Sequence, residues 1–147
     1  MKKFNFAMEN LLSFKNQILD NELQILSELN RQHENTLIKM SKIHENYENC
    51  KANLNQKLIQ SASPQECQMY MYYIVDLNEQ TKAVQREIDK VSMRIVEQIH
   101  KVREMKMETK SLETLKEKKF AEYKKAVIKT NELHMDEFIA GTRYLKA

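Results

Sequence analysis

Histidine and cysteine are the side chains of this sequence best suited to hold a metal or attack a substrate, and the chain contains four histidines and two cysteines. His33 and Glu34 begin like the helix motif of a zinc protease, but Leu37 stands where the second histidine of the i, i+4 pair is required. The other histidines have no constellation of cysteines or carboxylates near them: His44, His100 and His134. The sequence therefore predicts no metal site, no cofactor and no catalytic residue.

The elements that position these residues are marked by the one proline of the chain, Pro64. Ser63 suits a helix N-cap, Pro64 suits the first helical position, and Glu66 suits the carboxylate of a capping box. Apolar residues recur every three or four positions on both sides of this turn, as in amphipathic helices. These patterns predict an all-α fold, a long antiparallel two-helix coiled-coil hairpin with a longer, overhanging C-terminal helix.

We expect a single coiled-coil domain over residues 1–147, with helix one at about 5–59, a turn at 60–63 and helix two at about 64–140. The composition, 41% hydrophobic and 31% charged with a mean hydropathy of -0.69, is typical of a coiled coil. One glycine and one proline are too few for the turns of a sheet or for a phosphate-binding loop. Because a two-helix rod also lacks a concave, partly dry cavity, we expect no enzyme.

The compartment is indicated by the first residues and by the cysteines. Glu9 and Asn10 interrupt the basic and weakly apolar start before a signal peptide could form, and no window approaches the roughly 18 uncharged apolar residues of a membrane span. We therefore expect a cytoplasmic protein. Counted from the turn, Cys50 and Cys67 are offset by roughly 9 Å along the hairpin, so both are predicted to be free thiols.

A heptad seam runs along both predicted helices. In the first helix one heptad position recurs every seven residues, at Leu12, Leu19, Leu26, His33, Met40, Tyr47 and Leu54. The second seam position, between these, is assigned to Leu23, Leu29, Leu37, Ile43, Cys50 and Leu58. In the second helix the seam runs through Tyr70, Ile74, Leu77, Thr81, Val84, Ile88, Val91, Ile95, Gln98, Val102, Met105, Thr109 and Leu112. Polar members of a seam set its register, which is the role predicted for His33, Thr81, Gln98 and Thr109.

The seam of the second helix outlasts its partner. Antiparallel pairing places Leu112 opposite Leu11, and the same count then reaches Lys116 and Lys119, so the seam ends near residue 115. Residues from about 118 to 140 should project as a predicted overhang of roughly 30 to 35 Å. It carries apolar residues that the rest of the chain should not cover: Phe120, Tyr123, Val127, Ile128, Leu133, Met135 and Phe138. Such a stripe predicts a binding surface, with self-association as the competing interpretation.

Charge is unevenly distributed, although the net charge is only +3. Residues 101–130 contain ten basic and five acidic side chains, whereas residues 20–50 contain three basic and six acidic ones. Two interpretations stay open: a solvated helix face with intrahelical ion pairs, or a basic overhang that docks on an acidic protein surface. Nucleic acid is not favoured, because arginines are few and no aromatic platform for base stacking is apparent.

The start of the second helix is apolar on all sides. The segment 69–75 reads Met-Tyr-Met-Tyr-Tyr-Ile-Val, although the seam needs only Tyr70 and Ile74. The residues that should face outward are Met69, Met71, Tyr72 and Val75. Extra packing near the turn would explain them, but tyrosine and methionine are enriched at interfaces, which favours a protein-docking patch.

Residues 112–123, Leu-Glu-Thr-Leu-Lys-Glu-Lys-Lys-Phe-Ala-Glu-Tyr, followed by Met135-Asp136-Glu137-Phe138, resemble the C-terminal signature of the FliJ family of flagellar export proteins. The opening residues 4–12 and the serine-rich turn before an aromatic run are similar too, so the resemblance covers nearly the whole chain. It implies a non-catalytic central stalk of the flagellar type III export ATPase, similar in shape to the gamma subunit of rotary ATPases.

The resemblance also implies partners and contact residues. The end with both termini would enter the hexameric ATPase ring, and the turn end would reach the cytoplasmic domain of the export gate, with export chaperones as further partners. For ATPase binding the shared motif gives Asp136, Glu137 and Phe138, to which the charge distribution adds Lys118, Lys119, Lys125 and Arg143. For gate binding the candidates are Ile43, Tyr47, Tyr72, Tyr73 and Leu77. The protein would be peripheral to the membrane through these partners, and the open alternatives are a self-associating structural coiled coil and an injectisome stalk protein.

Overall fold

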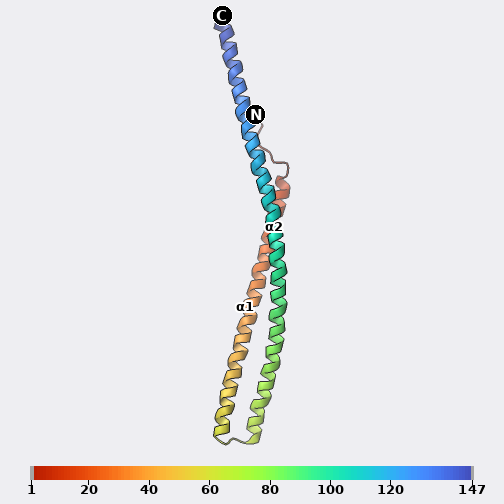
Figure 1. Ribbon diagram of the computed structural model, residues 1–147, viewed down its shortest axis with the longest axis vertical. Coiled ribbons are helices and arrows are strands. Elements are labelled where there is room, and N and C mark those ends of the chain that lie inside the picture. Colours follow the sequence, from red (N-terminus) through yellow and green to blue (C-terminus); the bar gives the residue numbers. More distant parts are fainter. Residues whose placement is uncertain (1, 147) are drawn as a thin grey trace. The chain divides into compact units, whose positions relative to one another are not determined.

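The computed structural model describes residues 2–146 and consists of two long α-helices joined by a short turn (Figure 1). Helix α1 spans Glu9–Ile59 and helix α2 spans Pro64–Lys146, and this described range contains no strand. The two helices pack against each other in opposite directions, which confirms the predicted all-α hairpin. Two compact units can be distinguished: one contains the residues through Asn21 and those from Val102 onward, and the other spans Glu22–Lys101.

Both outer helix ends differ from the predicted positions. Helix α1 begins at Glu9 rather than near residue 5. The Glu9 amide donates to the Phe6 carbonyl at 3.0 Å, so a turn precedes the helix. Helix α2 continues through Gly141 to Lys146 rather than ending near residue 140. A glycine inside a helix costs only about 1 kcal/mol relative to alanine. Gly141 keeps a negative φ, so it does not end the helix.

In unit Glu22–Lys101 the turn is held by both helix ends. The Ala62 amide donates to the Lys57 carbonyl at 3.0 Å and the Ser61 amide to the Leu58 carbonyl at 3.3 Å, which together form a Schellman motif. Ser61 takes the left-handed position with φ 58°, where glycine is the usual residue. The Glu66 amide donates to Ser63 Oγ at 3.3 Å, so the predicted N-cap is confirmed.

The same unit contains most of the heptad seam. Leu77, Val84 and Val91 are buried, and Leu77 is only 1% exposed. Cross-helix contacts fix the register, since Cys50 Sγ lies 3.7 Å from the Tyr70 carbonyl and Lys39 Nζ lies 3.6 Å from Glu87. The predicted polar seam residue Gln98 is buried, and its amide donates to the Glu22 carbonyl at 2.9 Å and to the Glu22 carboxylate. The buried amide of Gln98 thereby finds partners across the helix pair.

Four predicted seam positions are wrong. Strict heptads place the intermediate positions of α1 in this unit at Glu22, Leu29, Thr36, Ile43, Cys50 and Lys57, all of which are buried or half-buried. Leu23, Leu37 and Leu58 each lie one residue further along and are exposed. Thr81 is exposed as well, and its hydroxyl donates to the carbonyl of Leu77 one turn earlier. Geometry overrides hydrophobicity here, because a heptad repeat fixes which position faces the partner whatever residue occupies it.

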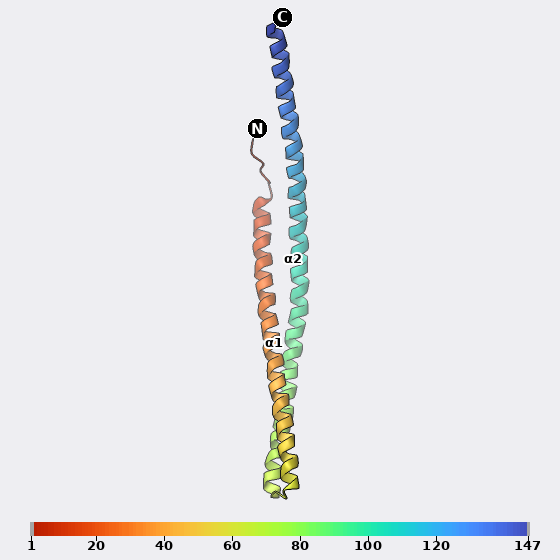
Figure 2. The ribbon, with the colours of Figure 1, turned by 90° about the vertical axis from the view of Figure 1, so that its left-hand side faces the viewer.

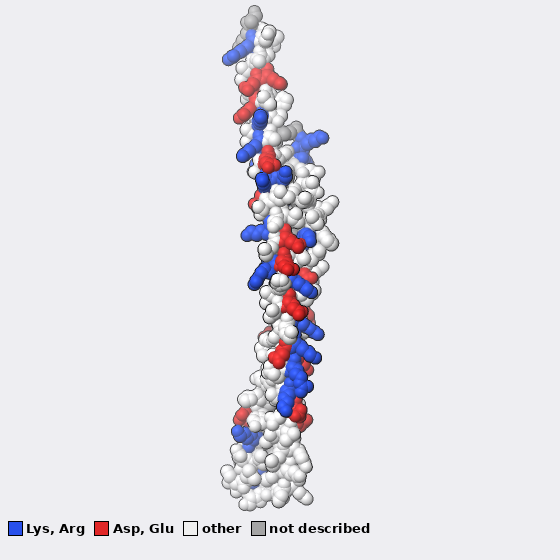
Figure 3. All heavy atoms as spheres, turned by 45° about the vertical axis from the view of Figure 1, so that its right-hand side comes forward, with Lys and Arg blue, Asp and Glu red and all other residues white. Residues whose placement is uncertain are grey.

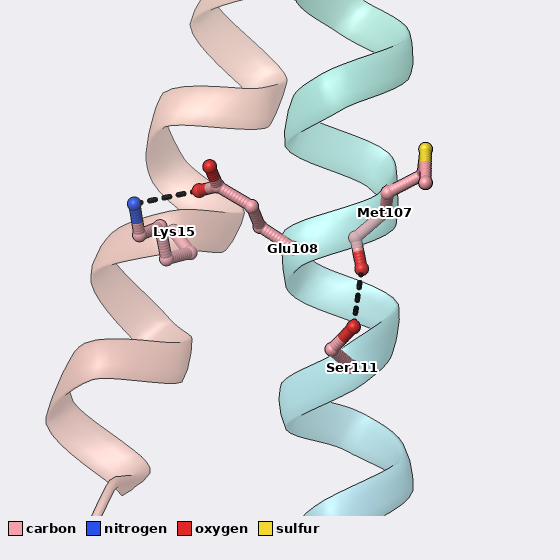
Figure 4. Close-up of polar contacts among 4 residues, drawn as sticks. All are labelled: Lys15, Met107, Glu108 and Ser111. Atoms are coloured by element: carbon pink, nitrogen blue, oxygen red, sulfur yellow. Dashed lines mark hydrogen bonds and ion pairs between the residues drawn. The ribbon is translucent and has the colours of Figure 1, made fainter.

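In the other unit, the first turns of α1 lie beside α2. Lys15 Nζ lies 2.7 Å from Glu108 (Figure 4), and Lys116 Nζ lies 2.8 Å from Glu9. The apolar core of this unit contains Phe6, Leu12 and Val102. Figure 2 shows α2 running past the N-terminal residues within this unit.

Thr109 occupies a seam position of this unit and is only 4% exposed, yet its hydroxyl has no hydrogen-bond partner among the residues that the structure describes. A buried polar atom without a partner costs about 1 to 3 kcal/mol. We therefore expect Thr109→Val to raise the free energy of unfolding by about 1 kcal/mol, measured by urea denaturation. Thr36→Val is the matched control, because the buried Thr36 hydroxyl donates to the His33 carbonyl at 2.7 Å. Equal gains in both variants would contradict this explanation.

Candidate functional site

The described residues contain no group of three or more His, Cys, Asp or Glu side chains that could hold a metal ion. His33 lies half-buried in the helix seam, and His134 lies 3.9 Å from Glu137 on an exposed part of α2. No helix between residues 2 and 146 is long and apolar enough to cross a membrane. Two surfaces of the described residues stand out as candidate functional sites.

The first surface begins where the N-terminal residues lie against α2. We call Lys2–Met8 the strap. The Phe4 ring packs edge-on against Phe120 with centroids 5.1 Å apart and lies 5.6 Å from the Tyr123 ring. The Tyr123 hydroxyl donates to the Lys2 carbonyl at 2.7 Å. A hollow of about 680 Å³ between the strap and α2 is lined on the α2 side by Leu115, Lys119, Glu122, Tyr123 and Ala126.

The strap corrects the predicted overhang, which was expected to be bare from about residue 118. The strap packs on Phe120 and Tyr123. Beyond Tyr123, no described residue of α2 has a hydrogen bond, ion pair or ring contact with the strap or with α1. The uncovered segment is therefore residues 127–145 of α2. A sequence signal was available: Phe4 and Phe6 are two residues apart, a spacing that places both rings on one face of an extended chain but not on one face of a helix.

Large apolar side chains of the uncovered segment face solvent. Ile128 is 58% exposed, Met135 62% and Phe138 72%. A folded chain seldom leaves an apolar stripe of this kind without a partner. The segment therefore qualifies as a docking surface.

The predicted ATPase-binding residues all lie on exposed positions of α2, but on different faces. Spacings of 7 and 11 residues correspond to whole helical turns and bring four of them to one face: Lys118, Lys125, Asp136 and Arg143. Phe138 is turned roughly 200° from Asp136, so it points to the opposite side. Lys119 lies 3.7 Å from Glu122, and Lys124 Nζ lies 4.6 Å above the Phe120 ring.

The second surface lies beside the turn, on the first turns of α2. We call it the tip surface, and its exposed members are Met69, Met71, Tyr72, Tyr73 and Val75. The predicted outward direction of four of them is confirmed, with Met69 72% exposed and Tyr72 66%. Gln68 Nε2 donates to the Tyr72 hydroxyl at 2.9 Å, one helical turn away. A hollow lined by Lys57, Glu66, Met69, Tyr70 and Tyr73 adjoins it.

The predicted gate-binding residues do not form one continuous patch. Tyr72 and Tyr73 are exposed, whereas Leu77 is buried in the seam and Ile43 is half-buried there. Tyr47 lines a different hollow, together with Leu37, Met40, Ser41, His44, Asn78 and Thr81. Surface contact is therefore open to the two adjacent tyrosines, while the other three residues are buried or half-buried at positions of the helix seam.

Both cysteines are free, as the sequence predicted, but their environments differ. Burial raises the pKa of the Cys50 thiol, whereas Cys67 is half-exposed. A raised pKa keeps Cys50 protonated at neutral pH, and only the thiolate is reactive. Iodoacetamide at pH 7.5 should therefore alkylate Cys67 first, with Cys50 reacting only as the pH rises or urea is added. Peptide mass spectrometry measures the order, and equal rates at pH 7.5 would contradict it.

Comparison with known protein families gives a match that covers nearly the whole chain. The sequence model of the family described as Flagellar FliJ protein matches residues 4–147. Searches of curated proteins and of solved structures give no significant match.

Proposed function

The chain belongs to the FliJ family of flagellar proteins and so has a role related to flagellar export, and from this premise we propose that it is the central stalk of the flagellar export ATPase. The uncovered segment of α2 enters the ring of the hexameric ATPase. The tip surface contacts the cytoplasmic domain of the export gate. The stalk has no catalytic residue and acts in the cytoplasm at the export apparatus, where it also meets export chaperones.

The observation that supports this proposal most directly is the single-helix segment, residues 127–145, which follows a paired region and leaves Ile128, Met135 and Phe138 exposed. A single helix has a diameter of about 10 to 12 Å, so this segment is narrower than the helix pair that precedes it. The uncovered stripe also gives a ring something to grip. A ligand shifts the states of a ring only through unequal contacts with those states.

The ATPase contact is proposed for two groups of side chains. The charged group comprises Lys118, Lys119, Lys125, Asp136, Glu137 and Arg143, all exposed on α2. Phe138, 72% exposed, is the apolar anchor on the other side of the helix. Charged side chains around an apolar anchor give orientation and a fast encounter, and the anchor gives most of the affinity.

The gate contact is proposed for Tyr72 and Tyr73, with the neighbouring exposed methionines completing the tip surface. Leu77, Ile43 and Tyr47 support it from the seam by holding α1 and α2 together behind the tyrosines. An aromatic pair backed by a rigid interface is a suitable anchor, because little conformational entropy is lost on binding.

The test is reconstitution with the purified export ATPase of the same organism. We expect the protein to raise the rate of ATP hydrolysis and to sediment with the hexamer. A truncation that ends at Ala126 should lose both effects while the helix pair remains folded by circular dichroism. Full stimulation by the truncated protein would contradict the stalk proposal and favour a structural coiled coil.

A further inference from the structure

Charge is polarised along the exposed end of α2. Residues 116–129 contain six lysines and two glutamates, whereas residues 130–142 contain Glu132, Asp136 and Glu137 and neither lysine nor arginine. Figure 3 shows acidic side chains gathered near the end of α2 and basic ones next to them along the helix. Lys125 and Glu132 are both exposed, and neither has an ion pair with any other described residue.

The same stretch carries a second heptad seam, distinct from that of the hairpin. Its positions alternate three and four residues apart: Ala121, Lys124, Ile128, Asn131, Met135, Phe138, Thr142 and Leu145. The strap lies mainly on the other side of the helix, since the hollow beneath it is lined by Lys119, Tyr123 and Ala126, and it reaches only the margin of this face, where Phe4 packs on Phe120. Ile128, Met135 and Phe138 are each more than half exposed. This face therefore has the pattern of a coiled-coil strand that lacks its partner.

We propose that a second copy of this chain is that partner, paired antiparallel through residues 117–142. Antiparallel pairing brings the basic half of each helix against the acidic half of the other, whereas parallel pairing would bring lysines against lysines. Lys125 then faces Glu132 of the second copy, and two-fold symmetry repeats this ion pair on the other side.

Packing in the seam is compatible with this register. Phe138 of one copy lies opposite the small Ala121 of the other, so a large side chain meets a small one. Lys124 faces Met135, and it already turns its ammonium group away from the seam, over the Phe120 ring at 4.6 Å. The pairing hides Phe138 and Lys125, so the dimer and the ATPase-bound stalk exclude each other.

Sedimentation equilibrium of the full-length protein tests the pairing. At a protomer concentration on the order of 100 µM we expect a mass approaching twice the 17.6 kDa of the monomer. Lys125→Glu and Glu132→Lys should each weaken the dimer about tenfold, because each replaces two attractive pairs with two repulsive ones. An equimolar mixture of the two variants should recover the wild-type mass, since the heterodimer restores both ion pairs, one with its original charges and one with the charges exchanged.

Lys129→Glu is the matched control, because it makes the same charge change on the side of the helix away from this seam. It should change the dimerisation constant much less than Lys125→Glu. A monomeric wild type at that concentration would overturn the proposal, and so would a mixture that stays monomeric. The measurement contains no ATPase, so its outcome is independent of the stalk proposal.

Discussion

Replacing Lys118, Lys119 and Lys125 together by glutamate is expected to abolish stimulation of the purified export ATPase without loss of helical content. All three side chains are exposed, so the helix pair does not depend on them. Removing one partner of a buried charge pair at an interface costs about 2 kcal/mol or more, and three reversals add repulsion to that loss. The rate of ATP hydrolysis, measured with and without the variant, should return to that of the ATPase alone.

The matched control reverses Lys90, Lys101 and Lys106, which are equally exposed but lie on the part of α2 that is paired with α1. This variant should stimulate the ATPase as the wild type does. Unchanged stimulation by the first variant would refute the basic contact, and a loss in both would show a general charge effect rather than a local one.

Replacing Tyr72 and Tyr73 by alanine is expected to weaken binding to the cytoplasmic domain of the export gate by at least about thirtyfold, because tyrosine anchors at interfaces commonly contribute about 2 kcal/mol or more. Both rings are exposed, 66% and 45%, so their removal should leave the fold intact. Isothermal titration calorimetry with the isolated gate domain measures the change.

Tyr144→Ala is the control, since Tyr144 is an 88% exposed tyrosine at the other end of α2. Gate binding should be unaffected by it, and the Tyr72 and Tyr73 variant should still stimulate the ATPase. If the double variant lost gate binding and ATPase stimulation together, the assignment of two separate docking surfaces to the two ends of α2 would be wrong.

The parts of the fold that could be predicted from the sequence depend on short-range chemistry. Ser63 caps α2 through its own hydroxyl. The seam residues from Leu12 to Leu54 lie seven residues apart, a spacing that the helix repeat itself imposes. The intermediate positions were predicted less well, because Leu23, Leu37 and Leu58 were assigned to the seam on their hydrophobicity alone. The helix geometry instead places Glu22, Thr36 and Lys57 there, where Thr36 is buried with its hydroxyl bonded to its own helix.

The candidate surfaces likewise combine features that the sequence predicts with features that it does not. Exposure of Tyr72 followed from its position outside the seam, and so did exposure of the lysines on α2. The cover over Phe120 and Tyr123 could not be predicted in this way, because it involves Phe4 and Lys2, more than one hundred residues earlier in the chain. No local rule connects residues at that separation.

Two helices, the turn between them, their antiparallel seam and the excess length of the second helix could all be predicted from the sequence, because capping, proline chemistry and heptad spacing act over a few residues. Only the tertiary structure decided where the second helix becomes uncovered, since that depends on how far the strap reaches along α2. It also decided which predicted contact residues are accessible: Leu77 is buried and Tyr72 is exposed, because the facing helix covers one side of α2 and leaves the other open.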